Sequence, residues 1–541
     1  MITDRAAAGT PIHLAPASPR GAGLLRLGLV LLVVLLIGAP SLIYPFGRDQ
    51  GEYATIAELA MGGRVIYRDV FNVKPPATHL LHALALTLFS RSMQAIRWLD
   101  LLWQAATALV LLRIAARIGL NRRAALLAPV VYAIAHYAHD FWNTAQTDGF
   151  LNLPAALAVL AFLRAHQRGE RWAYAASGAA IGVAVLFKYP IGILLPLLWL
   201  CAALARRRPW RALVWMSLGC SLPLIGCAVW LYAEGALLPF IDSQFHYLTR
   251  YVGRNPTPFG RLRLLALILR FQLRVTIPLG LACLCGAFLL ASAPRHRRGS
   301  GTMILVSWLL AACIDYLAQG KGYLYHGLPI LAPAALLAAQ VTSRASARDA
   351  QTRWLHLLFV ALATTSLAWP VTLYARQLHE SRSVGAVVDV LAGDISPQHI
   401  CRSEHPLCYS GDPGFALPDQ LAAAEFIAAH SEPSDPLFVW GFEPTIYFAA
   451  ERKPASRFIF NLVFVGDWRW PELREQLLAD LAHRPPRYVV VARDDARPLN
   501  TGVLDDSATA LQGFAELRHL IETDYRLDAI FGNLTLYRAV P

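Results

Sequence analysis

The chain has 541 residues, of which 56% are hydrophobic and only 16% are charged, and its mean hydropathy is +0.42. This composition excludes an ordinary soluble globular protein of this size and indicates a protein with many membrane spans. The net charge of +13 divides into 34 basic and 13 acidic residues over 1–373, and 15 basic and 23 acidic residues over 374–541. The arginines of the first part lie in short loops between apolar runs, a pattern that orients membrane spans, so we expect no nucleic-acid partner.

The apolar runs predict about 11 membrane spans. They lie near 27–44, 98–116, 124–138, 150–165, 172–187, 189–205, 212–233, 275–292, 303–319, 326–342 and 354–374. The first run resembles a signal peptide, but further spans follow it and no small-x-small cleavage site ends it, so we interpret it as a retained span. The segment 77–89 is short and contains two histidines, which favours a re-entrant or interfacial helix over a span.

With 77–89 kept on one side, the arginine-rich loops all fall on the same face, which is then cytoplasmic by the positive-inside rule. If 77–89 crossed the membrane, the loop "RIGLNRR" (117–123) would lie outside and break this pattern. The sequence therefore predicts a multi-pass protein of the bacterial inner membrane, with a cytoplasmic N-terminus and a periplasmic C-terminal tail.

The same topology brings five polar and aromatic segments to the outer face, namely 45–76, 136–150, 187–190, 232–261 and 319–327. Most acidic residues of the membrane body lie in these segments, whereas only Asp100 and Asp315 are candidates for the middle of a span. Transporters are expected to place ionisable groups near the membrane midplane. The pattern favours an enzyme with an outward-facing cavity, and a transporter or flippase of lipid-linked saccharides is the alternative.

Three of the four lysines, Lys74, Lys188 and Lys321, fall in separate outer-face turns. A lysine ammonium is a compact, mobile charge that suits a phosphate group. Arg270 and Arg274 lie in the helix-like stretch 260–280, where they would face lipid headgroups. We predict that these five cations bind the phosphate of a donor; interfacial snorkelling and plain anchoring are the alternatives.

Carboxylates and cations at an outer cavity suit the transfer of a sugar from a polyprenyl phosphate to an acceptor hydroxyl. A carboxylate would take the proton of the attacking hydroxyl, and cations would stabilise the departing phosphate. The sequence contains no Walker or dinucleotide fingerprint, as expected if the energy-rich donor is a lipid. Lipid A, another envelope glycan and a protein are the candidate acceptors, and a polymerase or ligase of longer lipid-linked glycans is a further alternative.

Several outer-face motifs resemble those of one enzyme class. They are "RDQGEYATIAELAMGGRVIYRDVFNVKPP" (48–76), "NTAQTDGF" (143–150) and "KGYLYHGLPILAP" (321–333). The chain resembles the GT-C class of membrane glycosyltransferases that use lipid-phosphate sugars, in particular the family 39 protein mannosyltransferases and the aminoarabinose transferase of lipid A. The resemblance implies a GT-C-like, polytopic α-helical body over 1–374, with its catalytic loop at 45–90.

The resemblance also implies roles for individual residues. Asp49 matches the first-loop acid and would be the general base, with Glu52 on the same side of a short helix; Asp148 matches the second-loop acid and Lys74 the "KPP" lysine. Helix or span capping is the alternative for Asp49 and for Asp148. Family members often have a second acid where this chain has Gln50, which argues against a role that needs two adjacent carboxylates, including a tightly bound metal.

We expect further pocket residues around these acids. They are Arg48, Tyr53, Tyr323, Tyr325 and His326. An aromatic belt at the membrane interface is the alternative for the tyrosines. We predict no organic cofactor and no metal site, with a divalent cation as the alternative. The expected partners are a polyprenyl-phosphate-linked sugar, the acceptor and membrane lipids.

The tail, 375–541, alternates helix-like and strand-like stretches and predicts a small extracytoplasmic α/β domain. Cys401 and Cys408 in "CRSEHPLC" are spaced for a small disulfide loop in an oxidising compartment; a reduced pair or a weak metal site is the alternative. The tail contains no convincing catalytic set, so we expect it to cover the cavity or to engage the acceptor.

Overall fold

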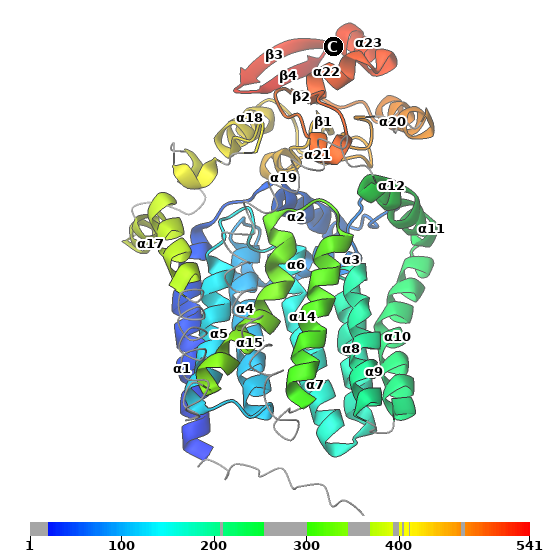
Figure 1. The fold of residues 1–541 in the computed structure, drawn as a ribbon. Coiled ribbons are helices and arrows are strands. Elements are labelled where there is room, and N and C mark those ends of the chain that lie inside the picture. Colours follow the sequence, from blue (N-terminus) through cyan, green and yellow to red (C-terminus); the bar gives the residue numbers. More distant parts are fainter. Residues whose placement is uncertain are drawn as a thin grey trace, which may run out of the picture.

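A bundle of apolar helices is capped at one end by the C-terminal segment, defined here as residues 375–541 (Figure 1). The computed structural model describes residues 20–205, 209–253, 300–344, 368–392, 400–402, 405–409, 412–466 and 471–540. In Figure 1 the bundle fills the lower part, and the strands of the C-terminal segment lie above it.

Five helical stretches of the described chain are long and apolar enough to cross a membrane. They are Gly23–Ile43, formed by α1 (Arg20–Gly38) and the 3-10 turn η1 (Ala39–Ile43); α4 (Ala95–Arg117); Thr147–Arg168, formed by α6 (Thr147–Phe150) and α7 (Asn152–Arg168); α10 (Pro209–Ala233); and Gly301–Ala318 within α14 (Ser300–Ala318). The chain is thus a multi-pass membrane protein.

Shorter helices complete the bundle. They are α5 (Arg122–Tyr137), α8 (Arg171–Val185), the 3-10 turn η2 (Tyr189–Ile193) with α9 (Leu194–Leu204), and the 3-10 turn η5 (Leu324–Gly327) with α15 (Leu328–Arg344). The predicted span 275–292 and most of the predicted span 354–374 lie outside the described residues. The number of spans therefore stays a prediction.

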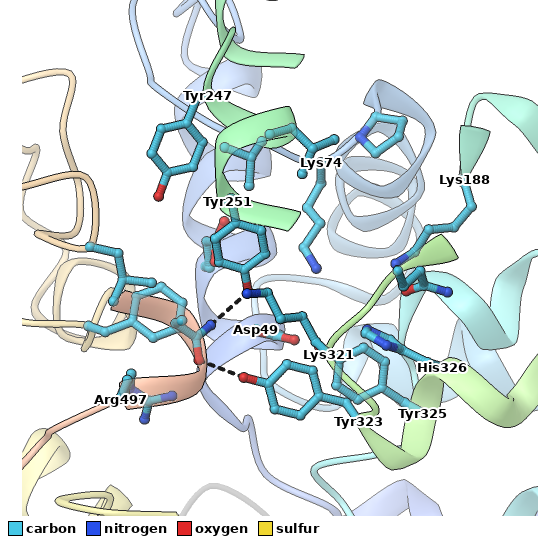
Figure 2. A pocket seen from close by; sticks show the side chains of 18 of the residues that line it. Asp49, Lys74, Lys188, Tyr247, Tyr251, Lys321, Tyr323, Tyr325, His326 and Arg497 are labelled. Carbon is cyan, nitrogen blue, oxygen red and sulfur yellow. Dashed lines mark hydrogen bonds between the residues drawn. The ribbon is translucent and has the colours of Figure 1, made fainter. Parts of the chain in front are cut away.

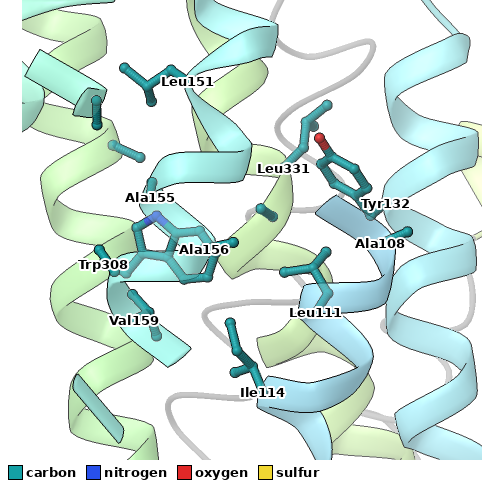
Figure 3. Close-up of a cluster of buried hydrophobic side chains, with 14 of the residues drawn as sticks. Ala108, Leu111, Ile114, Tyr132, Leu151, Ala155, Ala156, Val159, Trp308 and Leu331 are labelled. Atoms are coloured by element: carbon teal, nitrogen blue, oxygen red, sulfur yellow. The ribbon is translucent and has the colours of Figure 1, made fainter. Parts of the chain in front are cut away.

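Alanines, branched aliphatic side chains and two large aromatic side chains, Tyr132 and Trp308, pack together in the centre of the bundle (Figure 3). Trp308 of α14 is fully buried and lies beside Ala155, Ala156 and Val159 of α7. The alanines let the helices approach closely, which is the usual way for helices to associate where lipid offers no hydrophobic driving force.

Short helices cover the end of the bundle next to the C-terminal segment, which is the predicted outer end (hereafter the outer end). They are α2 (Arg48–Met61), α3 (Pro76–Phe89), α11 (Leu237–Ile241), the π-helix η3 (Asp242–Tyr247) and α12 (Leu248–Gly253). At 1.5 Å per residue α3 is about 21 Å long, which is short of the ~30 Å hydrocarbon core. The expected course of 77–89 along one side of the membrane stays a prediction.

The C-terminal segment contains a four-stranded sheet in the order β1-β2-β4-β3. β1 (Leu437–Trp440) runs parallel to β2 (Tyr488–Ala492), whereas β4 (Leu534–Ala539) is antiparallel to both β2 and β3 (Tyr525–Phe531). Every residue of β1 and β2 is buried, so both faces of these strands are covered.

The C-terminal segment also contains helices and short turns. They are α17 (Ser383–Ala392), η7 (Ile400–Arg402), η8 (Pro406–Cys408), α18 (Leu417–Ala429), α19 (Thr445–Ala450), α20 (Pro471–His483), α21 (Pro498–Thr501), α22 (Ser507–Gln512) and α23 (Ala515–Asp524). Of these, α17 packs against η1 of the bundle. Cys401 and Cys408 form a disulfide, with their Cα atoms 5.4 Å apart.

One hydrophobic cluster joins the C-terminal segment to the outer end of the bundle. It contains Ile56 of α2 and Tyr67 and Phe71 of the following loop, together with Trp440 of β1 and Phe458. The rings of Phe71 and Phe458 lie 5.6 Å apart. The C-terminal segment is therefore packed onto the loop that follows α2 through a shared core, which fixes their relative position.

Three glycines, Gly178 and Gly182 of α8 and Gly219 of α10, let the two helices pack closely. A Cβ at Gly219 of α10 would lie 2.0 Å from the carbonyl oxygen of Ala175, and a Cβ at Gly178 of α8 would lie 1.9 Å from that of Met216. Gly226, further along α10, has no atom within 4 Å of the place of a Cβ. The close approach of the two helices thus depends on these three glycines.

We expect Gly219→Leu to force α8 and α10 apart and to cost about 1–3 kcal/mol of stability. The thermal unfolding midpoint of the purified protein in detergent measures this effect. Gly226→Leu is the matched control on the same helix and should leave the midpoint unchanged. Equal midpoints for Gly219→Leu and Gly226→Leu would contradict the observed packing.

Candidate active site

A pocket lies between the outer end of the bundle and the C-terminal segment, with about 1250 Å³ of empty space including its open mouth (Figure 2). Segments far apart in the sequence meet in its wall. The body contributes Asp49, Glu52, Val73, Lys74, Pro75, Trp142, Lys188, Tyr189, Pro190, Tyr247, Leu248, Tyr251, Ala318, Gln319, Lys321, Tyr323, Tyr325 and His326. The C-terminal segment contributes Asp412, Phe442, Phe460, Leu462, Arg497 and Asn500.

The start of α2 places Asp49 in the pocket. Gly47 is extended, the helix begins at Arg48, and Asp49 lies in the first turn, where the helix dipole stabilises a carboxylate. The side chain is partly exposed and lines the cavity. Within the described part of the chain no hydrogen bond or ion pair engages this carboxylate. Asp49 is thus available to accept a proton from a bound group.

Glu52 lies three residues further along α2 but in a different environment. Only 3% of it is exposed, and its carboxylate accepts a hydrogen bond from Nδ2 of Asn72. Burial raises the pKa of the Glu52 carboxyl to about 8; the charge of Asp49 adds to the shift, and Lys74 and Asn72 oppose it. Glu52 is therefore mostly protonated at neutral pH, which favours Asp49 as the base.

Gln50 has a structural role here. The side chain is fully buried, and its Nε2 donates to the carbonyl oxygens of Thr144 at 2.8 Å and Trp142 at 3.1 Å. Its Oε1 accepts from the backbone N–H of Gly47 at 3.0 Å. An ionised acid in place of Gln50 would have no proton to donate to these carbonyl oxygens. The amide thus attaches the start of α2 to the loop 141–144.

Two residues predicted to line the pocket lie behind its wall instead. Arg48 is fully buried and points into the C-terminal segment, where its Nε donates to Oε1 of Glu443 at 2.8 Å and its Nη1 pairs with Asp412. Tyr53 is also fully buried, with its ring edge-on to the rings of His79 and His82 at 5.7 and 5.3 Å. Both residues support α2 rather than meet a ligand.

The three outer-face lysines all line the same pocket (Figure 2). Nζ of Lys74 lies 5.8 Å from the ring centre of Tyr53. Nζ of Lys321 donates to the carbonyl oxygen of Leu499 at 2.9 Å, and burial lowers the pKa of Lys321 from 10.5 to about 8. Arg270 and Arg274, the other two predicted phosphate ligands, lie outside the described residues.

Asp148 is buried beneath the third lysine. Nζ of Lys188 lies 3.3 Å from Oδ2 of Asp148 and donates to Oε1 of Gln319 at 2.6 Å. Nε2 of Gln319 donates to Asp148 at 3.0 Å and to Asp315 at 3.2 Å. The second-loop acid therefore fixes Lys188 and Gln319, which face the cavity, and is not itself part of the wall.

The predicted aromatic residues form one side of the cavity. The rings of Tyr323 and Tyr325 stack 5.5 Å apart, and the ring of His326 packs edge-on against both. Tyr323 donates its hydroxyl proton to Oδ1 of Asn500 at 2.6 Å, and Nδ2 of Asn500 donates to the hydroxyl of Tyr251 at 2.8 Å. Asn500 thus links two tyrosines of the body to the C-terminal segment.

We expected the tail to cover the cavity or to engage the acceptor, but none of the residues by which the C-terminal segment lines the pocket was predicted from the sequence. The charged members of this wall are Asp412 and Arg497, which form an ion pair, and Phe442 and Phe460 add aromatic surface. The charged run "RDDAR" (493–497), directly after a buried strand, was the available signal for Arg497. Among the described residues no group of three or more histidines, cysteines and acids is placed to hold a metal ion.

Comparison with known proteins gives a family match for part of the chain and a shared fold for most of it. Residues 73–232 match the family described as dolichyl-phosphate-mannose-protein mannosyltransferase. The structure is similar to the crystal structure of ArnT from Cupriavidus metallidurans bound to undecaprenyl phosphate, with a TM-score of 0.57 and 16% identity over 97% of this chain and 99% of ArnT.

Two further membrane proteins have a similar fold. The Archaeoglobus fulgidus oligosaccharyltransferase in the apo form matches with a TM-score of 0.51 and 13% identity over 86% of this chain and 69% of its own. The arabinofuranosyltransferase AftD from Mycobacteria matches with a TM-score of 0.50 and 15% identity over 97% of this chain and 40% of AftD. The resemblance to the GT-C glycosyltransferases is confirmed, and the chain carries, over residues 73–232, a domain of the dolichyl-phosphate-mannose-protein mannosyltransferase family within a fold shared with ArnT.

Proposed function

We propose that this glycosyltransferase moves a sugar from a polyprenyl-phosphate donor to a hydroxyl acceptor at the outer face of the bacterial inner membrane. The observation that carries the proposal is the arrangement of the pocket, in which the Asp49 carboxylate shares one cavity with Lys74, Lys188 and Lys321. The family match and the shared fold are with glycosyltransferases, so they do not favour the transporter or flippase alternative.

The proposed reaction is a single displacement at the anomeric carbon. The acceptor hydroxyl oxygen attacks this carbon while Asp49 takes the hydroxyl proton. The bond from the anomeric carbon to the phosphate oxygen breaks, and its electron pair leaves with the lipid phosphate. Lysine ammonium groups facing the cavity stabilise the charge that develops on that phosphate. A single displacement inverts the configuration of the transferred sugar.

The donor is expected on the side of the pocket that the lysines form, and the acceptor on the side that the C-terminal segment forms. Undecaprenyl phosphate is bound in the ArnT structure, which supports a polyprenyl-phosphate donor for this chain as well. Arg497, Asn500 and Phe442 give the opposite wall hydrogen-bonding and aromatic surface. Such a wall suits a hydroxyl-bearing acceptor, whether lipid A, another envelope glycan or a protein.

We expect Asp49→Asn to lower kcat for sugar transfer on the order of 10²–10⁴-fold, because the amide cannot take the hydroxyl proton. Transfer of radiolabelled sugar in membranes supplied with lipid-linked donor measures the loss. Glu58→Gln is the matched control, since Glu58 lies on the same helix and forms a half-exposed ion pair with Arg91 that is worth little. Undiminished transfer by Asp49→Asn would refute the assignment of the base.

The pH dependence of kcat/KM for the donor should report the protonation of Lys321. The pKa of about 8 means that the ammonium is present below pH 8 and is lost as the pH rises through that value. We therefore expect kcat/KM for the donor to fall above pH 8, by about tenfold when one charge-assisted contact is lost.

Lys321→Arg tests this assignment, because the guanidinium stays protonated over the whole range. The alkaline fall of kcat/KM should move to higher pH in this variant, whereas Lys453→Arg, which changes an exposed lysine outside the pocket, should leave the profile as it is. An identical alkaline limb in the native enzyme and in Lys321→Arg would contradict a role for the Lys321 charge.

A further inference from the structure

A second cavity lies on the other side of the loop that follows α2, away from the active site. One wall comes from this loop, with Arg64, Arg68 and Asp69, and the other from the C-terminal segment, with Arg457 and helix α20. It shares no lining residue with the active-site pocket. Phe71 lies between the two cavities. Its ring packs against Phe460 of the active-site wall, and the ring centre lies 5.9 Å from the guanidinium carbon of Arg457.

The cavity contains more cations than its own acids neutralise. Four arginines line it, against two aspartates, and both aspartates are already engaged. Asp69 accepts two hydrogen bonds from Arg68 at 2.9 and 3.0 Å. Asp480 accepts from the hydroxyl of Ser456 at 2.6 Å and from the backbone N–H of Arg457 at 3.3 Å. Of the described acids, none lies within ion-pair distance of Arg64, Arg457 or Arg484.

These three guanidinium groups keep unused hydrogen-bonding capacity. Arg457 is half-buried; its Nη2 donates to the carbonyl oxygen of Tyr67 at 2.5 Å, whereas its Nε is buried without a hydrogen-bond partner among the described residues. Within the described part of the chain, the Arg484 side chain donates one long bond, 3.4 Å, to the carbonyl oxygen of Pro454. Burial lowers the pKa of both Arg457 and Arg484, and Arg64 adds to the shift of Arg484. Gathering partly desolvated like charges is unfavourable unless an anion joins them.

The position of the cavity limits the source of such an anion. Nη1 of Arg68 donates to the carbonyl oxygen of Glu234 at 2.7 Å, and Glu234 follows directly on the last residue of the spanning helix α10. The cavity thus lies at the level where a spanning helix leaves the membrane, and that level is occupied by lipid headgroups.

We propose that the cavity formed by Arg64, Arg457 and Arg484 is a binding site for a phosphate group carried by a lipid headgroup. Guanidinium forks match phosphate oxygens with pairs of parallel hydrogen bonds. A phosphate bound here lies against the same loop that leads through Phe71 and Asn72 to Lys74 of the active site. The site anchors either a structural phospholipid or a phosphorylated acceptor lipid beside the reaction centre.

The test measures binding of phosphatidic acid to the purified full-length chain in neutral detergent, by native mass spectrometry. The variant is Arg64→Gln with Arg484→Gln. The matched control is Arg493→Gln with Arg526→Gln, which also removes two arginine charges. Both control residues are exposed in the C-terminal segment and lie outside the cavity. We expect the cavity variant to weaken phosphatidic acid binding by about tenfold or more, and the control to bind as the native chain does.

Inorganic phosphate as a competitor shows whether the site recognises the phosphate group alone or also needs the lipid chains. Competition by inorganic phosphate at millimolar concentration supports a site that recognises the phosphate group alone, and its failure supports a site that also needs the lipid. Equal phosphatidic acid binding by all three proteins, or equal losses in both double variants, would overturn the proposal. Should the double variant fail to fold, Arg64→Gln alone carries the test, because Arg64 is exposed. Since the readout is binding, it does not depend on sugar transfer.

Discussion

The buried guanidinium of Arg48 is the interaction on which the active site depends. The Arg48 side chain reaches from α2 into the C-terminal segment. There Glu443 accepts hydrogen bonds from its Nε at 2.8 Å and from its Nη2 at 2.5 Å, and Asp412 pairs with its Nη1. The ring centres of Trp142 and Phe415 lie 6.0 and 5.3 Å from the guanidinium carbon. The pair with Glu443 is fully buried, whereas Asp412 is 30% exposed and lines the pocket. A buried pair of this kind adds little net stability over apolar residues, but removing one partner costs about 3–5 kcal/mol. Arg48 is therefore best understood as fixing the position of α2.

Asp49 follows Arg48 directly, and its place in the pocket results from this attachment. Two further contacts hold the same turn of helix: Gln50 binds the carbonyls of the loop 141–144, and a Cβ at Gly51 would lie 1.9 Å from the Thr445 hydroxyl of α19. The first turn of α2 is thus held by the bundle on one side and by the C-terminal segment on the other. A carboxylate held in this way needs little reorganisation when a hydroxyl approaches, which is what a general base requires.

The sequence predicted the parts of the site that lie in local motifs. The helical membrane body, the loop with Asp49 and Glu52, and three outer-face lysines follow from composition, charge placement and short patterns. The sequence could not predict that the Arg48 side chain points away from the pocket and binds Glu443, because the two residues are 395 positions apart and no local pattern links them. For the same reason Arg497 and Asn500 were not predicted as pocket residues, although the tail was expected to cover the cavity. The burial of Asp148 beneath Lys188 likewise depends on packing between helices, which a span pattern does not contain.

The central claim is that Asp49 and the three lysines form one donor site between the bundle and the C-terminal segment. A cryo-electron microscopy structure of the chain with a bound polyprenyl-phosphate lipid tests it most directly. The account predicts the lipid phosphate within hydrogen-bonding distance of at least one of Lys74, Lys188 and Lys321, with the Asp49 carboxylate facing the position of the anomeric carbon. A phosphate bound outside this pocket, with Asp49 directed away from it, would contradict the account.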